Sequence, residues 1–332
     1  MSPQARSSPL RVLYLANYAP VPNDAGTADL NEGFKYSRYH REMLTVLEEL
    51  GFLVTSTRTT QALLDKPNSY DYVFSLLNRA PHRGSEILVS ALCEYFKLPY
   101  LGARPNIRAV AEDKYVTKLV ARQLGFEVAD GRVYRPSDTK LPSPSFAGPY
   151  VAKPRSGASS KHITEACLQD SWSDLVPEVR RLIELGDDVL VEEWIDGINV
   201  TLPVIGGSPP LILPAYELES EKKGQLVTYE QKRGIEKGVK RRGFDDEDMI
   251  REMNRLAEIL YRNAVPIDYL RLDFRVTPTN RCVFLEFNVC CNIGPQSGFT
   301  ACAEQIGLSH REMLVRILTH SFERQKINWQ AL

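Results

Sequence analysis

The sequence lacks the features that would place it in a membrane or an oxidising compartment. None of its apolar runs approaches the ~20 residues that a membrane-spanning helix needs, and no signal peptide precedes the first predicted strand. Its six cysteines form no Cys-x-x-Cys pair, and Cys290 and Cys291 are neighbours that are poorly placed to bridge each other. We therefore predict a reduced, cytoplasmic protein.

The sequence also lacks an excess of charge of either sign. Its 41 Lys and Arg residues nearly balance its 42 Asp and Glu residues, which leaves a net charge of −1. Nothing in this balance steers the chain toward nucleic acid or an anionic membrane. With 332 residues the chain can bury a large core, and we expect about two or three lobes.

Strands alternate with helices over roughly the first hundred residues. Compact apolar runs predict strands at residues 11–17, 52–56 and 72–77, and a helix is predicted at residues 85–96. This alternation predicts an open parallel α/β sheet, whose ligands bind beyond the C-terminal ends of its strands. The loops after Asn17 and Leu77 should therefore face the active site.

A smaller α+β lobe is predicted next. Residues 109–124 have the periodicity of one amphipathic helix, which contains Lys114. Short strand-like runs follow at residues 131–134, 150–153 and 188–195. Between the last two, Lys153 precedes a small, flexible loop at residues 155–160, whose N–H groups and hydroxyls could contact phosphates. Such Gly/Ser loops are common, so this motif is weak by itself.

The most informative stretch is a predicted β-hairpin, with strands at residues 269–276 and 282–289 around a Thr-Pro-Thr-Asn-Arg turn. Side chains alternate between the two faces of a strand. The charged residues of the first strand should therefore share one face, as should the polar residues of the second. These residues are Arg271, Asp273 and Arg275, then Glu286 and Asn288, whereas Leu285, Phe287 and Val289 should take the opposite face.

The polar residues of this hairpin suggest a metal site. Asp273 and Glu286 supply two carboxylates and Asn288 an amide carbonyl, which is the hard oxygen set that Mg²⁺ prefers when phosphates complete its shell. Arg271 could hold a developing negative oxygen. A solvated outer face of an antiparallel sheet is the alternative.

These motifs, in this order, resemble the ATP-grasp superfamily, and the branch that looks closest is D-alanine–D-alanine ligase with its amino-acid ligase relatives. The most specific part is Arg271-x-Asp273-Phe274, with Glu286-x-Asn288 thirteen residues after the aspartate. The resemblance implies a three-lobed α/β ATP-grasp fold. It has an N-terminal open parallel α/β sheet (1–104), a small α+β central lobe (105–192) and a larger α+β C-terminal lobe (193–332).

The resemblance also implies cofactors and site residues. ATP and two Mg²⁺ ions, for which Mn²⁺ could substitute, are the expected cofactors, with Asp273, Glu286 and Asn288 as metal ligands. The implied nucleotide site comprises Lys114, Lys153, Ser159, Ser160, Glu192, Glu193, Trp194, Ile195, Asn199, Lys232 and Leu285. Lys232 lies in a loop that would close over the phosphates, and the implied catalytic residues are Arg271, Lys232 and Ser159.

The substrate side departs from the family pattern. The family's small-Pro-Gly turn after the metal-binding asparagine is replaced by Cys290-Cys291-Asn292, and only Ser297 keeps the pattern for holding the second substrate's carboxylate. The family glutamate that holds the first amino acid's ammonium aligns near Phe34, and Glu32 is the nearest candidate. The residues assigned to substrate are Arg271, Asn292, Ser297 and Glu32.

We therefore predict an ATP-dependent ligase that joins the carboxylate of an amino acid to an amine, with ADP and phosphate as further products. One alternative cyclises a single substrate, and another is an ATP-grasp kinase for small molecules. A non-catalytic nucleotide-binding subunit is disfavoured because the metal set and both lysines are present. The expected partners are amino-acid-like small molecules and a second copy of the chain, since homodimers are usual among such relatives.

Overall fold

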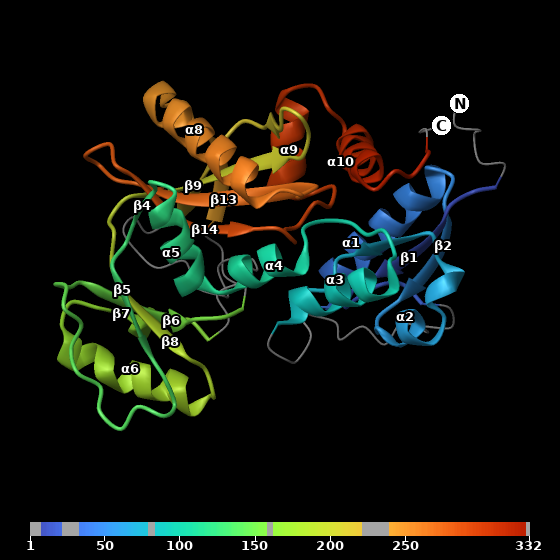
Figure 1. The fold of residues 1–332 in the computed structure, drawn as a ribbon. Coiled ribbons are helices and arrows are strands. Elements are labelled where there is room, and N and C mark those ends of the chain that lie inside the picture. The colour runs from blue at the N-terminus through green and yellow to red at the C-terminus, as the bar shows by residue number, and fades with distance from the viewer. Residues whose placement is uncertain (1–7, 22–32, 79–83, 158–161, 221–238, 330–332) are drawn as a thin grey trace.

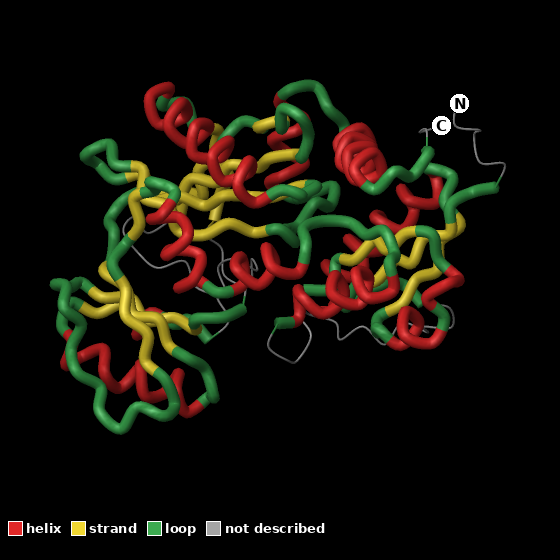
Figure 2. Tube along the Cα trace, in the orientation of Figure 1, coloured by secondary structure: helices red, strands yellow, loops and turns green. Residues whose placement is uncertain are grey.

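The computed structural model describes residues 8–21, 33–78, 84–157, 162–220 and 239–329 of the chain. These residues form three β-sheets, each with its own helices (Figure 1). The strands of the three sheets are separate groups in the tube view (Figure 2). The predicted three-lobed α/β fold is confirmed.

The N-terminal lobe is built on a parallel sheet with the strand order β2-β1-β3, as the alternation of strands and helices predicted. One face of this sheet packs against the last helix of the chain, where the Tyr72 ring lies edge-on to Phe322 at 4.7 Å. The elements are β1 (Arg11–Leu15), α1 (Gly33–Glu49), β2 (Leu53–Thr57), α2 (Gln61–Asp65), the 3-10 turn η1 (Pro67–Ser69), β3 (Tyr72–Ser75) and α3 (Ser85–Phe96).

An antiparallel sheet with the order β5-β8-β6-β7 forms the central lobe. Tyr150, Ala152 and Val191 pack under its helix α6, whereas Lys153 and Glu192 alternate with them and take the opposite face. The face away from α6 is therefore the charged one. The elements are β5 (Gly131–Tyr134), β6 (Tyr150–Pro154), the 3-10 turn η2 (Glu165–Cys167), β7 (Leu168–Gln169), α6 (Trp172–Glu184) and β8 (Val189–Glu193).

The C-terminal lobe holds the largest sheet, with the order β12-β11-β9-β13-β14-β4 and β10 paired to β9. Alternate residues of β13, such as Leu270 and Leu272, are buried in one core with Met253 and Leu256 of α8. The elements are β4 (Glu127–Val128), β9 (Ile198–Ile205), β10 (Leu211–Ile212), β11 (Tyr216–Ser220), β12 (Val239–Gly243), α8 (Glu247–Ala264), β13 (Tyr269–Val276), β14 (Cys282–Asn288), α9 (Gly298–Gln305) and α10 (His310–Arg324).

The arrangement of helices leaves two sheet faces turned toward each other. In Figure 1, α8 lies above the large sheet, while the central lobe lies below it with α6 on the far side. The face of the large sheet away from α8 and the face of the central sheet away from α6 therefore look toward each other. The predicted divide at residue 104 stays a prediction, since β4 comes from the central segment but pairs with β14.

The single helix predicted at residues 109–124 is wrong. The structure has two helices, α4 (Pro105–Glu112) and α5 (Lys114–Gln123), which are separated by Asp113 in an extended conformation. The Asp113 carboxylate accepts hydrogen bonds from the N–H groups of Tyr115 and Val116, so it caps α5 as an N-cap residue. Lys114 is consequently the first residue of a helix and not part of its middle.

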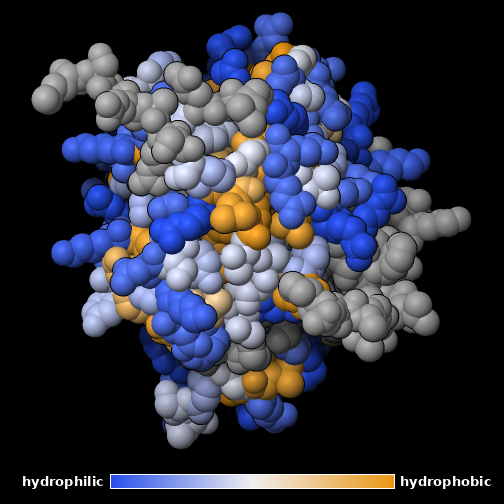
Figure 3. All heavy atoms as spheres, turned by 90° about the vertical axis from the view of Figure 1, so that its right-hand side faces the viewer, coloured by the Kyte–Doolittle hydropathy of each residue, from blue (hydrophilic) through white to orange (hydrophobic). Residues whose placement is uncertain are grey.

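The surface and the thiols agree with an ordinary globular protein. Seen from the N-terminal lobe, an orange apolar patch is surrounded by hydrophilic side chains (Figure 3). All six cysteines are unpaired and buried. In the described part of the chain, no helix combines the length and the apolarity that crossing a membrane requires.

Candidate active site

Three polar side chains of the hairpin meet on the face of the large sheet opposite α8. The register pairs Asp273 with Glu286 and Arg271 with Asn288 across β13 and β14. Asn288 Nδ2 lies 3.2 Å from Asp273 Oδ2 and 3.4 Å from Glu286 Oε1. On the other side, the Thr201 hydroxyl of β9 donates to Asp273 Oδ1 at 2.9 Å. The two carboxylates and the amide are thus neighbours in space.

This group suits a hard divalent cation. Among the described residues no three His, Cys, Asp or Glu side chains form a metal-binding group, so a site here depends on the amide as third ligand. An amide turned by 180° occupies the same volume. It would present the Asn288 carbonyl oxygen where its NH₂ now faces the carboxylates, and that completes a three-oxygen set of the kind Mg²⁺ takes.

A β-bulge sets the geometry next to these ligands. Asp273 pairs with Glu286 but Phe274 pairs with Phe284, so Leu285 is an extra residue in β14. Leu285 is half-buried, like Glu286, whereas Phe284 and Phe287 are buried. Strict alternation, which assigned Leu285 to the apolar face with Phe287, was therefore wrong at this residue.

Arg271 is bound to the metal-site aspartate by a two-pronged ion pair. Its Nε donates to Asp273 Oδ1 at 3.0 Å and its Nη2 donates to Oδ2 at 2.7 Å. Burial lowers the pKa of Arg271, but the nearby Asp273 more than offsets this and the pKa is raised overall. The guanidinium therefore stays cationic beside the carboxylates, and it fixes the orientation of Asp273.

Two lysines share one carboxylate on the central lobe's charged face. Lys153 Nζ lies 2.5 Å from Glu192 Oε2, and Lys118 Nζ lies 2.7 Å from Glu192 Oε1. Burial raises the pKa of Glu192, but the two lysines lower it by more than burial raises it, so the pKa of Glu192 is lowered overall. Glu192 is therefore a carboxylate between two ammonium groups, and the cluster carries a net positive charge that suits phosphate.

Sequence reasoning missed Lys118. It stands four residues after Lys114 on α5, so the two lysines lie on one side of the helix. Glu286 is among the charges that raise the pKa of Lys118, although burial lowers this pKa overall. The electrostatic link shows that the lysine cluster and the metal-site carboxylates belong to one region.

The start of α5 is tied to the beginning of the Gly/Ser loop. Lys114 Nζ donates to the Gly157 carbonyl, and the Arg155 guanidinium forms a forked ion pair with Asp113, with its Nη2 2.7 Å from Oδ2. This places Lys114 beside the predicted phosphate loop. The predicted residues Ser159, Ser160, Lys232 and Glu32 lie outside the described residues.

The segment that leaves β8 connects the two sheets. The N–H of Glu193 donates to the Asp130 carbonyl at 3.1 Å, and that of Trp194 donates to the Pro149 carbonyl at 2.7 Å. Ile195 is half-buried, and Asn199 lies opposite Arg275 in the β9–β13 register. The predicted nucleotide residues 192–195 and 199 thus belong to the segment that leads from β8 of the central sheet to β9 of the large sheet.

The segment after the metal-site asparagine contacts the N-terminal lobe. Asn78 Nδ2, from the loop after β3, donates to the Cys290 carbonyl at 3.0 Å. Asn292 is exposed, and its Oδ1 accepts from the Gly294 N–H at 2.9 Å. Ser297 is the N-cap of α9: its Oγ accepts from the Thr300 N–H at 3.0 Å and is 4% exposed. The Ser297 hydroxyl itself donates to Thr300 Oγ1 at 3.1 Å, so a substrate carboxylate would compete with Thr300 for this donor.

Glu86 is a second residue that sequence reasoning missed. It lies in the first turn of α3, at the C-terminal edge of the parallel sheet. Burial raises its pKa to about 7, and the charges of Glu112 and Glu286 add to the shift, whereas Arg108 and Lys114 oppose it. The N-terminal lobe therefore brings one carboxyl group into the electrostatic field of the site. The available signal was the position of Glu86 at a strand-to-helix junction of the predicted α/β sheet.

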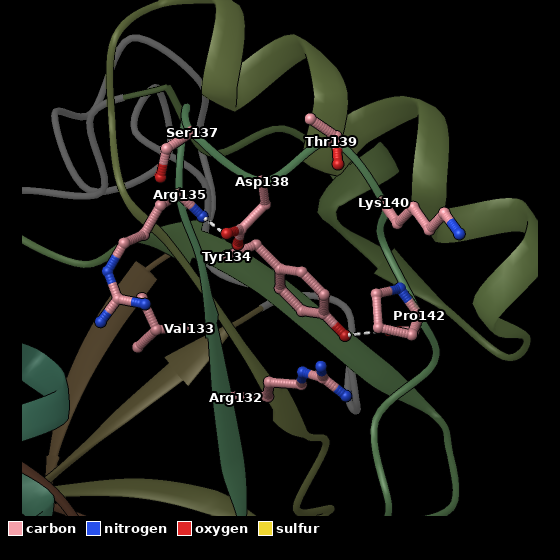
Figure 4. Close-up of a pocket in the computed structure, with 9 residues that line it drawn as sticks. All are labelled: Arg132, Val133, Tyr134, Arg135, Ser137, Asp138, Thr139, Lys140 and Pro142. Atoms are coloured by element: carbon pink, nitrogen blue, oxygen red, sulfur yellow. Dashed lines mark hydrogen bonds between the residues drawn. The ribbon is translucent and has the colours of Figure 1, made fainter.

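One pocket of about 450 Å³ lies elsewhere (Figure 4). Its lining residues come from β5 and the loop that follows, and include Arg132, Tyr134 and Lys140. Tyr134 packs on Trp172 of α6 with ring centroids 5.2 Å apart, so this pocket is on the α6 side of the central sheet. Lys153 and Glu192 project from the other side, and the pocket is therefore separate from the candidate site.

Comparison with known proteins identifies the family. A family model described as D-ala D-ala ligase C-terminus matches residues 139–319, which is more than half of the chain. The chain belongs to this family. The resemblance to the ATP-grasp ligases and the prediction of an ATP-dependent ligase forming carbon–nitrogen bonds are confirmed at this level, and the kinase and cyclising alternatives are not favoured. The family implies ATP, a divalent metal and small amino-acid substrates.

Individual relatives are similar over most of their length. The D-alanine–D-alanine ligase of Aquifex aeolicus is 27% identical over 237 residues, which are 71% of this chain and 78% of that protein. The ligase of Bordetella petrii is 26% identical over 289 residues, 85% of each chain. The solved D-alanyl-alanine synthetase A of Vibrio cholerae shares the fold with a TM-score of 0.75 at 17% identity, covering 96% of this chain and 100% of its own.

The lysine cluster of this ligase-family protein leads to a testable expectation. Lys153→Ala and Lys118→Ala should each weaken ATP binding by about tenfold or more, since each removes a point charge from the phosphate side of the site. Calorimetric titration with ATP and Mg²⁺ measures the effect. Lys140→Ala, in the separate pocket, is the matched control. Unchanged affinity in both variants would mean that phosphates bind elsewhere.

Proposed function

We propose that this chain activates the carboxylate of an amino-acid-like substrate as an acyl phosphate and joins it to an amine, and that its main product is not D-alanyl-D-alanine. The observation that supports the chemistry is the convergence of Asp273, Glu286 and Asn288 with the ion-paired Arg271, on a face that looks toward the lysine cluster. Anionic oxygens from ATP, the carboxylate and the acyl phosphate must gather in one cleft, and these charges suit them.

Each group has a place in this proposal. Asp273, Glu286 and Asn288 would hold the Mg²⁺ ions, two by family resemblance, and the bound ions would supply charge neutralisation to phosphate oxygens. Lys114, Lys118 and Lys153 would hold and orient the phosphates. Arg271 would stabilise the negative oxygens of the acyl phosphate and of the tetrahedral centre formed by amine attack. Catalysis is then mostly positioning and charge stabilisation, with no nucleophilic side chain.

Water exclusion is the remaining requirement, because an exposed acyl phosphate hydrolyses. By family resemblance, Lys232 and the serines Ser159 and Ser160 belong to loops that would close over the phosphates. The hydrogen bond from Lys114 to Gly157 supports the assignment of the two serines, since it holds the start of the Gly/Ser loop against α5. We also propose a cytoplasmic location, because the cysteines are unpaired, and a homodimer, because homodimers are usual among such relatives.

The substrate site differs from that of a D-alanine–D-alanine ligase at the end that would hold the second substrate. Cys290-Cys291-Asn292 replaces the small-Pro-Gly turn, and the Cys290 carbonyl is engaged by Asn78. The Ser297 hydroxyl is buried as a helix cap. A buried polar site rejects a poorly matched ligand by large factors, because its own groups are left unpaired. The bulk of this segment and the engaged Ser297 hydroxyl should therefore select another amine or another amino acid.

Product analysis tests this proposal. With ATP, Mg²⁺ and D-alanine alone, the purified protein should release phosphate at less than about one hundredth of the rate seen with its best substrate pair. The pair is found from phosphate release across a panel of amino acids and amines, with mass spectrometry of the products. Brisk conversion of D-alanine to the dipeptide would refute the substrate claim while leaving the ligase chemistry intact.

A further inference from the structure

A buried arginine lies on the site face and has no carboxylate partner within the described part of the chain. Arg275 is only 8% exposed, and its Nη1 donates a hydrogen bond to the Gly197 carbonyl at 3.1 Å. Its Nε is buried and has no hydrogen-bond partner among the described residues. Arg271 and Arg155, by contrast, each have a forked ion pair with an aspartate.

The surroundings of Arg275 indicate where the nucleoside part of a bound nucleotide would lie. Arg275 is two residues beyond Asp273 on the same face of β13, which puts their Cα atoms about 6–7 Å apart. Its guanidinium carbon lies 4.4 Å from the centre of the Trp194 ring, in the segment that joins the two lobes. Asn199 is directly opposite on β9. Arg271 precedes Asp273 by two residues and Arg275 follows it by two, so the two arginines flank Asp273 along β13, and Arg275 is the one beside Trp194.

An unpaired guanidinium in this place needs an explanation. Leaving a buried donor unsatisfied costs free energy, and a buried cation costs more. The contact with Trp194 compensates part of this through the attraction between a cation and an aromatic ring. A methionine would fill the same volume at lower cost. A ligand that brings a hydrogen-bond acceptor to Arg275 would remove the remaining penalty, and it would bind more tightly for that reason.

We propose that Arg275 is a nucleoside-binding residue of this protein, which donates a hydrogen bond to an acceptor on the base or ribose of the nucleotide. The Trp194 ring would hold the Arg275 guanidinium in place for this contact. This inference rests on the proposed function, because it takes the triphosphate to lie over Asp273, Glu286 and Asn288. The contribution of Arg275 is specificity: nucleotides that lack the acceptor should lose affinity, and the phosphate contacts should be unaffected.

Nucleotide titration by calorimetry tests the proposal on the full chain. Arg275→Met keeps the apolar bulk and should bind ATP about tenfold to a hundredfold more weakly, the range expected for a hydrogen bond from a charged donor. Arg275→Lys keeps the charge without the planar fork and should recover only part of this loss. Arg281→Met is the matched control, since Arg281 is an exposed arginine at the turn of the same hairpin, paired with Glu127.

Modified nucleotides identify the acceptor. 7-Deaza-ATP and GTP alter the base, and 2′-deoxy-ATP and 3′-deoxy-ATP alter the ribose. One of these analogues should bind the wild type more weakly than ATP does. The same analogue should bind Arg275→Met as tightly as ATP does, because that variant has already lost the contact. Equal ATP affinity in wild type and Arg275→Met would overturn the proposal, as would losses that add for all four analogues. Failure of the wild type to bind any nucleotide would instead contradict the proposed function.

Discussion

Replacing Asp273 with Asn, or Glu286 with Gln, is expected to leave a folded protein whose ATP-dependent turnover is lower by about a hundredfold or more. Each change removes one anionic oxygen ligand from a site that has two carboxylates and an amide, and divalent-ion binding depends on that charge. Asp273→Asn also removes the acceptor of the Arg271 fork. Phosphate release with saturating ATP at ordinary Mg²⁺ concentrations measures the loss.

Two controls separate this effect from misfolding. Glu247→Gln makes the same isosteric change on the exposed face of helix α8, where the Glu247 side chain is 88% exposed, and should retain full turnover. Chelation of divalent ions should reduce the wild type to the level of the Asp273→Asn variant, and excess Mn²⁺ should restore the wild type. Full turnover in both site variants would remove the basis for a metal centre at this hairpin.

The hairpin could be predicted because its signals are local. β13 runs from Tyr269 to Val276, the limits that its apolar run and its turn predicted. The period of two then placed Arg271, Asp273 and Arg275 on one face, and the register adds that Asp273 lies opposite Glu286. Neighbouring side chains decide these features, so a single sequence contains them.

Features that depend on partners distant in sequence were not predictable in the same way. The break between α4 and α5 is set by an N-cap, and the Asp113 carboxylate that caps α5 is also held by Arg155, 42 residues later in the chain. The bulge at Leu285 arises from pairing with β13, and periodicity within β14 gives no sign of it. Lys118 looked like one more helical lysine until Glu192 was seen beside it.

The residues that would bind the second substrate could be predicted from the sequence even less well. The sequence showed that the Pro-Gly turn is missing after Asn288, but not what replaces its function. In the structure, the loop after β3 reaches this segment through Asn78, and Glu86 brings its carboxyl group into the field of Glu286. Both contacts join residues about two hundred apart in the chain, which no periodicity can reveal.

A buried ion pair joins the three parts of the chain that enclose this end of the site. Asp268, just before β13, is 0% exposed. Its carboxylate accepts from the Gly102 N–H at 2.6 Å, from Arg324 Nε at 2.5 Å and from Arg324 Nη2 at 2.9 Å. Arg324 of α10 also donates to the Tyr100 and Gly102 carbonyls, each at 3.0 Å. The pair thereby links residues 100–102, where the chain leaves the N-terminal lobe, to the large sheet and to the last helix.

Asp268→Asn is expected to lower the free energy of unfolding by about 3–5 kcal/mol, because it leaves the largely buried Arg324 guanidinium without its counter-charge. Urea unfolding followed by tryptophan fluorescence measures the change. The paired replacement of Asp268 by Leu and Arg324 by Met should cost less than the single change, since no buried charge is left unpaired. Glu252→Gln, which breaks the more exposed pair with Arg255, should cost about 0.5 kcal/mol or less. If Asp268→Asn costs no more than that control, the three segments must be held together by their apolar contacts alone, and the ion pair is incidental to the closure of the site.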